Sequence, residues 1–132
     1  MDRMFKCKIN GQERYLNYSI EVMFDAIDKF GTASDMLQKI GEETREGFEA
    51  LRWMIVHLVN DAELSRREQG YDPLPMLQEN DISVRMLPLD YKELQSAAVE
   101  AIAYGYNREV ENPEEETDLG LAELNQKKTK AD

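Results

Sequence analysis

Side chains able to do acid–base, nucleophilic or metal chemistry are few in this 132-residue chain. His57 is the only histidine and Cys7 the only cysteine, which excludes internal disulfides, multi-histidine metal sites and cysteine-based zinc sites. His57 has no serine or cysteine at a spacing that suggests an activated nucleophile. Carboxylates are abundant, as at Glu42 and Glu43, but they match no calcium loop or other metal-ligand pattern. We therefore predict no catalytic residue, no cofactor site and no metal site.

The charge balance argues against nucleic acid as a partner. The chain carries 27 acidic and 16 basic side chains, for a net charge of −11, and such a surface repels phosphate. Apolar residues make up 42% and charged residues 33% of the chain, which is typical of a globular protein. Its longest apolar run, residues 53–56, is far too short to cross a membrane. We expect a soluble, non-secreted protein that binds neither nucleic acid nor membrane.

The elements that must position any site begin with a β-hairpin over residues 4–16. Residues 4–9 alternate between apolar and basic side chains, and Asn10-Gly11 is the preferred dipeptide of a two-residue type I′ turn. This turn predicts that Phe5 pairs with Leu16 and Lys8 with Glu13. A lone hairpin is marginal in water, so its apolar face must rest on helices.

Capping residues and apolar spacing predict helices over residues 19–30, 34–40, 44–69 and 90–110, with one or two helical turns over 81–87. Ser19, Ser34, Thr44 and Asp90 are the expected N-terminal caps of the four longer helices. In the first helix, one apolar stripe is expected to face the core, formed by Ile20, Met23, Phe24, Ile27 and Phe30.

The predicted fold class is mainly α, within α+β: a short N-terminal hairpin packed on a small bundle of about four to five helices. Residues 1–110 are expected to form a single globular domain. Residues 111–132 hold seven acids, three lysines and no aromatic residue, a composition that favours a flexible acidic tail.

The long central helix offers a candidate partner-binding face. In helical projection its apolar residues fill one broad sector, with Trp53 and His57 nearly opposite and Val56 between the two faces. One interpretation is a helix packed on both sides, with Trp53 in a second small cluster. The other is that Trp53, Val56 and His57 mark an interface, since tryptophan anchors are enriched there.

The final helix ends with two tyrosines on either side of Gly105. Tyr104 and Tyr106 are candidate interface aromatics, although a rim of half-buried tyrosines is an ordinary feature of small helical proteins. We include them in the candidate partner-binding set.

The order of these features resembles the tail assembly chaperones of long-tailed bacteriophages and prophages. The resemblance spans residues 4–110: the KINGQE hairpin at 8–13, the amphipathic helix at 20–30 ended by Gly31, the central helix, the DIS segment at 81–83, the LPLDYKEL segment at 87–94, and the EAI-containing last helix. These are patterns of small helical proteins and contain no catalytic signature.

The resemblance implies a non-enzymatic role in virion assembly. Proteins of this family act in the cytoplasm of the infected or lysogenic bacterium, where they bind the long tape-measure protein and keep it soluble while tube subunits polymerise around it. The expected partners are the tape-measure protein and, as a second candidate, the tail tube protein, with self-association left open.

Two other function classes fit a small acidic helical protein. A structural head–tail connector or completion protein of a phage would have similar size and helical content, but it would be found in purified virions. An acidic inhibitor that mimics nucleic acid would need a dense array of carboxylates on one rigid face. Here Arg66, Arg67 and Lys92 interrupt the acidic residues, which disfavours the mimic.

Overall fold

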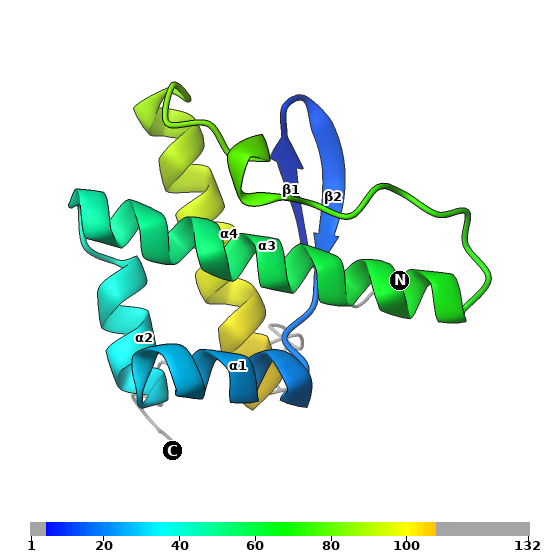
Figure 1. Ribbon diagram of the computed structural model, residues 1–132, viewed down its shortest axis with the longest axis horizontal. Coiled ribbons are helices and arrows are strands. Elements are labelled where there is room, and N and C mark those ends of the chain that lie inside the picture. Colours follow the sequence, from blue (N-terminus) through cyan, green and yellow to red (C-terminus); the bar gives the residue numbers. More distant parts are fainter. Residues whose placement is uncertain (1–4, 108–132) are drawn as a thin grey trace, which may run out of the picture. The chain divides into compact units, whose positions relative to one another are not determined.

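The computed structural model describes residues 5–107. Within this part of the chain lie an N-terminal β-hairpin, four α-helices and one short 3₁₀ turn (Figure 1). The mainly α fold with a short N-terminal hairpin, predicted from the sequence, is therefore confirmed. The expected flexible tail over residues 111–132 lies outside the described residues.

The hairpin pairs β1 (Phe5–Ile9) with β2 (Gln12–Leu16) in the expected antiparallel register. Phe5 stands opposite Leu16 and Lys8 opposite Glu13. Asn10 and Gly11 both adopt positive φ, at 55° and 78°, as a type I′ turn requires. The hairpin rests on the central helix, since Ile9 and Leu16 are buried in the common core and the Asn17 backbone N–H donates to the Leu58 carbonyl at 3.1 Å.

Two short helices follow, and a side chain caps each of them. α1 (Ile20–Phe30) is capped by Ser19, whose hydroxyl accepts from the Val22 N–H, as expected. α2 (Ala33–Ile40) is capped by Thr32 rather than by Ser34: Thr32 and Asp35 form a reciprocal capping box. Thr32 therefore caps the helix two residues before Ser34, the cap predicted from the sequence, and the helix begins at Ala33.

The central helix, α3 (Arg45–Glu68), is capped by Thr44 and runs across the middle of Figure 1, with α1 beneath it and α4 crossing behind. Its side chains are buried on more than one side, as expected for a central helix. Together with the hairpin, α2 and α4 it forms a single apolar core, whose most buried large side chains are Leu16, Met36, Ile40, Leu51, Met54, Ile55, Leu58, Val59, Ile82 and Ile102.

The segment after α3 crosses back over it without regular structure. The side-chain amide of Asn60 forms two hydrogen bonds with the backbone of this segment. Its oxygen accepts from the Leu77 N–H at 2.7 Å, and its nitrogen donates to the Leu77 carbonyl at 3.0 Å. Arg14 of β2, itself buried, donates to the Pro75 carbonyl at 2.7 Å. Polar side chains thus supply the hydrogen bonds that a sheet would otherwise provide.

Two sequence-based boundaries near α4 were wrong. The helical turns expected over 81–87 are a 3₁₀ turn, η1 (Glu79–Asp81), followed by non-helical bends and turns. α4 (Pro88–Tyr106) begins at Pro88 and ends before Asn107, instead of spanning 90–110. Proline suits the first position of a helix, where its missing N–H has no partner to lose, so Asp90 lies inside the first turn and is not the cap.

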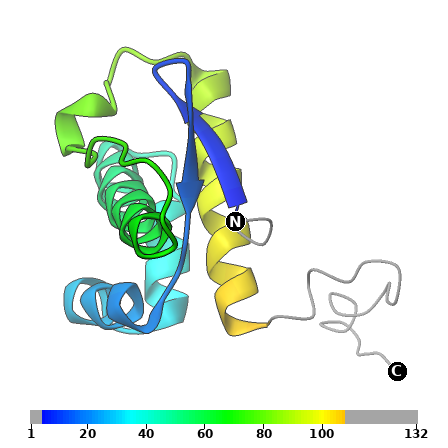
Figure 2. The same cartoon turned by 90° about the vertical axis from the view of Figure 1, so that its right-hand side faces the viewer.

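The described residues divide into two units between Ile102 and Ala103, with residues 5–102 in the first and 103–107 in the second. The first unit holds the hairpin, α1, α2, α3, η1 and α4 as far as Ile102. Figure 2 shows this unit from a second direction, with the hairpin beside α4 and α3 seen nearly end-on. The second unit begins with the last turn of α4.

Candidate functional site

Three of the five residues predicted to face the core from α1 face solvent instead, which corrects the sequence-based expectation for them, whereas Phe30 packs against the core as expected. Val22 and Ala26 are the buried residues of this helix, and the small side chain of Ala26 lets the helix backbone pack closely. Ile20, Phe24 and Ile27 are instead 68%, 57% and 40% exposed. Their spacing of i, i+4 and i+7 puts them on one stripe. We call these three residues the α1 stripe.

Contacts with α3 fix the rotation that turns the α1 stripe outward. At the start of α1, Ser19 Oγ donates to Asp61 Oδ1 at 2.9 Å, and Asn17 Nδ2 donates to Asp61 Oδ2 at 2.8 Å. At its end, the ring of Phe30 meets the indole of Trp53 edge to face, with centroids 5.4 Å apart. Residues just before α1 and the last residue of α1 thereby attach both ends of the helix to α3.

Trp53 and His57, two of the candidate partner-binding residues, lie together in a small cluster on α3. Their rings stack with centroids 3.7 Å apart, and His57 Nδ1 lies 2.9 Å from the Trp53 carbonyl oxygen. Lys29 Nζ lies 5.6 Å from the centre of the Trp53 ring. Trp53 and His57 are both half-buried, which is the arrangement of a helix packed on both sides with a second cluster around Trp53.

The other three candidates are Val56, Tyr104 and Tyr106. Val56 is buried in the main core at 9% exposure, so its side chain offers little surface to a partner. Tyr104 is half-buried and Tyr106 is 52% exposed. These tyrosines lie in the last turn of α4, within the unit that begins at Ala103, and their spacing of two residues points them to different sides of the helix.

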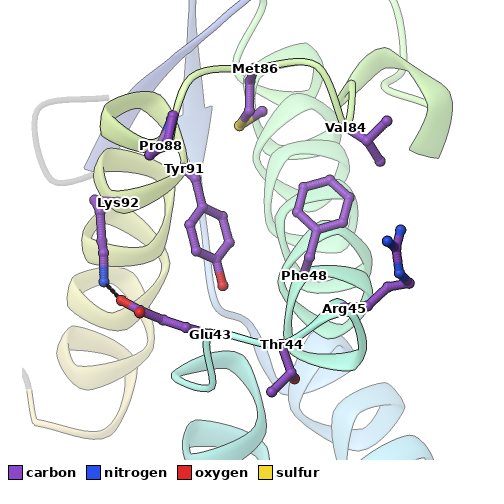
Figure 3. Close-up of a pocket in the computed structure, with 9 residues that line it drawn as sticks. All are labelled: Glu43, Thr44, Arg45, Phe48, Val84, Met86, Pro88, Tyr91 and Lys92. Carbon is purple, nitrogen blue, oxygen red and sulfur yellow. Dashed lines mark hydrogen bonds and ion pairs between the residues drawn. The ribbon is translucent and has the colours of Figure 1, made fainter.

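A shallow cleft of about 450 Å³ opens between the first turns of α3 and α4 (Figure 3). Phe48 and Tyr91 face one another across it, with ring centroids 6.1 Å apart. The Tyr91 hydroxyl donates to the Glu42 carbonyl at 3.0 Å. Met86 closes the upper side in Figure 3, and an ion pair between Lys92 and Glu43 lies at the rim. Such a cleft suits an apolar side chain.

A second cleft, of about 600 Å³, lies between the hairpin and residues 81–94. Charged side chains of both signs line it, namely Lys6, Lys8, Arg85, Asp81, Asp90 and Glu93. Cys7 is also in its lining. Burial raises the pKa of the Cys7 thiol to about 12, and the nearby Arg14 offsets only part of this effect. The thiol is therefore protonated at neutral pH and poorly suited to act as a nucleophile.

Glu63 is the buried carboxylate of the molecule's described part, at 2% exposure. Burial by itself would raise its pKa, but hydrogen bonds from the Leu74 N–H at 2.7 Å, from Arg67 at 2.9 Å and from Arg66 at 2.7 Å outweigh that effect and hold the pKa below its ordinary value. Arg66 is itself placed between the rings of Tyr15 and Tyr71. Its carboxylate joins α3 to the loop that follows it, so we assign Glu63 a structural role.

Residues 5–107 contain no group of three or more His, Cys, Asp or Glu side chains placed to hold a metal ion. Over the same residues, no helix has both the length and the apolar character needed to cross a membrane. The surface of the described residues carries the α1 stripe and the two clefts, and Val84, Leu87 and Leu89 are further apolar side chains exposed at 64%, 67% and 68%.

No known protein family, curated protein or solved structure matches this chain.

The helical spacing of Ile20, Phe24 and Ile27 is visible in the sequence, but it predicts a core-facing stripe rather than an exposed one. One signal could have corrected this. Each apolar member is followed directly by an acid, in the pairs Ile20-Glu21, Phe24-Asp25 and Ile27-Asp28. Val22 and Ala26, at i and i+4, offer a second apolar direction of smaller side chains. Which of these two sides of α1 packs on α3 depends on how closely the two helices approach each other, and the sequence does not give that distance.

Proposed function

We propose that this protein is a non-enzymatic tail assembly chaperone of a long-tailed bacteriophage or prophage. It binds the tape-measure protein in the bacterial cytoplasm and keeps it soluble during assembly of the tail tube. The observation that carries this proposal is the α1 stripe: Ile20, Phe24 and Ile27 are 40% to 68% exposed on one face of a well-capped helix. The resemblance in the order of sequence elements supplies the identity of the partner.

An exposed helical stripe suits a protein that covers apolar segments of another chain. Burying a large aliphatic or aromatic side chain contributes about 1.5–3 kcal/mol when its exposure is lost completely. The partly exposed residues of the α1 stripe would each contribute a fraction of that on binding. Binding of this strength is reversible, as a chaperone requires, because its client must be released to the growing tube.

The main alternative is a head–tail connector or completion protein, which could use the same stripe as a permanent interface. The two functions differ in where the protein is found at the end of assembly. A chaperone is absent from finished particles, whereas a connector is a component of them.

A two-part experiment tests the proposal. The tape-measure protein is expressed alone and together with this chain, and the soluble fraction and co-purification are measured. Purified particles from the same phage are then analysed by mass spectrometry. We expect the tape-measure protein to be soluble and to co-purify only when this chain is present, with this chain absent from particles. If the tape-measure protein is unaffected and this chain is found in particles, the connector function would replace the chaperone function.

A further inference from the structure

We propose that the outer face of α1 binds an amphipathic helix whose apolar stripe is bordered by lysine or arginine. This inference rests on the proposed function only in taking the partner to be a helical chain. The surface itself is defined by two rows of side chains that run side by side along α1, which lies beneath α3 in Figure 1.

The first row is the α1 stripe, and the second is a row of acids. Glu21, Asp25 and Asp28 repeat the same i, i+4, i+7 spacing, one residue further along the chain. A step of one residue is 100° around a helix, so the second row lies on the adjacent side of α1. Phe24 follows Glu21 by three residues and precedes Asp28 by four, and side chains at these spacings are neighbours on a helix surface. We call Glu21, Asp25 and Asp28 the acidic row.

Within residues 5–107, no cation forms an ion pair with the acidic row, since none of its three carboxylates has a partner within 4.0 Å. The only basic residue of α1 is Lys29, and its ammonium group lies over the rings of Phe30 and Trp53, 5.8 Å and 5.6 Å from their centres. The acidic row is therefore available for opposite charges on a partner.

The arrangement selects among the helices that could cover the α1 stripe. A partner with basic residues beside its apolar stripe would place cations against the acidic row, while its apolar side chains met Ile20, Phe24 and Ile27. Charge complementarity of this kind raises the association rate and fixes orientation. A partner with acidic flanks would meet like charges along the whole contact.

A second copy of this chain is a poor occupant. Packing two α1 helices antiparallel about a two-fold axis places one acidic row against the other. Packing them parallel places the acidic row against the side of the partner α1 that carries Met23, which has no charge to offer. The whole-chain net charge of −11 adds further repulsion between copies.

The experiment measures binding of the full chain to two labelled synthetic helices of about 20 residues, long enough to form stable turns. Both carry leucine at the same i, i+4, i+7 positions; one has lysine and the other glutamate at the flanking positions. Fluorescence anisotropy gives the dissociation constants at low and high salt. We expect the lysine-flanked helix to bind about tenfold or more tightly at low salt, with an advantage that shrinks as salt rises.

Two variants and a matched control assign the effect to the two rows. Neutralising the acidic row with Glu21→Gln, Asp25→Asn and Asp28→Asn should remove most of the preference for the lysine-flanked helix and its salt dependence. Phe24→Ser should weaken binding of both helices. The control changes three exposed glutamates elsewhere, through Glu68→Gln, Glu93→Gln and Glu100→Gln, and should keep the preference.

Three results would overturn the inference: equal binding of the two helices, an unchanged preference after the acidic row is neutralised, or self-association that Phe24→Ser abolishes. The last result, seen by sedimentation, would assign the face to a second copy. Peptide binding with no effect on tape-measure solubility would refute the proposed function and leave this inference standing. Equal binding of the two helices, together with rescue of the tape-measure protein by wild type, would overturn this inference and leave the proposed function standing.

Discussion

The indole ring of Trp53 meets the phenyl ring of Phe30 edge to face, with centroids 5.4 Å apart. This contact joins the last residue of α1 to the middle of α3 and sets how α1 is rotated about its own axis. Because Phe30 points toward α3, Val22 and Ala26 also point inward. The larger residues Ile20 and Phe24 are left facing solvent. The exposure of the α1 stripe, which we propose as a partner-binding face, follows from this one rotation.

The rotation of α1 can be tested by stability measurements. Phe24→Ser removes a side chain that is 57% exposed, so we expect the free energy of unfolding to change by less than about 0.5 kcal/mol. Ala26→Leu forces a larger side chain into a buried position and should destabilise the fold by about 1–3 kcal/mol. Chemical denaturation measures both. A large loss for Phe24→Ser with no loss for Ala26→Leu would place the stripe in the core instead.

Glu63 makes the stability of the fold depend on acid. Its pKa is lower in the folded than in the unfolded chain, so its contribution is complete above the unfolded value of about 4.3 and is lost as pH falls through the folded pKa. Glu63→Gln should cost about 2 kcal/mol at pH 7. The gap between wild type and variant should close in more acidic solution.

Denaturant melts of both proteins between neutral pH and about pH 3 check this expectation. Glu68→Gln, on the same helix but exposed, is the matched control and should behave as wild type at every pH. A Glu63→Gln gap of constant size across this range would show that the carboxylate has no depressed pKa.

At Gly47, helix propensity and packing predict opposite effects of substitution to alanine. Helix propensity alone favours Gly47→Ala by about 1 kcal/mol. In the structure, however, a Cβ at this position would lie 2.2 Å from the Glu42 carbonyl oxygen, which is backbone and cannot rotate away. We expect Gly47→Ala to destabilise by about 1–3 kcal/mol. Ser96→Ala, on the exposed side of α4, is the control and should be neutral or slightly stabilising. Thermal melts of both variants measure these effects.

The features that the sequence predicted correctly are those decided by neighbouring residues. Asn10 and Gly11 determine the hairpin turn and therefore its register, and the Thr44 side chain caps Gly47 three residues later at 2.9 Å. Each of these depends on contacts within a few positions of the chain, where turn and capping preferences are strong.

Features decided by long-range packing were not predictable in this way. The cleft needs Phe48 of α3 and Tyr91 of α4 to face one another, and no local pattern relates them. The loop after α3 is held by Asn60 and Glu63 on the preceding helix. Similarly, the burial of Val56 depends on what α3 meets on that side, so helical projection alone could not remove it from the candidate face.

Co-expression with the tape-measure protein tests the central claim most directly when it compares wild type with one variant on the α1 stripe and one control variant elsewhere on the surface. The account predicts that wild type and Leu89→Ser keep the tape-measure protein soluble and co-purify with it, since Leu89 is a 68% exposed residue on α4 rather than α1. Phe24→Ser, equally well folded, should leave the tape-measure protein in the insoluble fraction. Full rescue by Phe24→Ser, or none by wild type, would contradict the account.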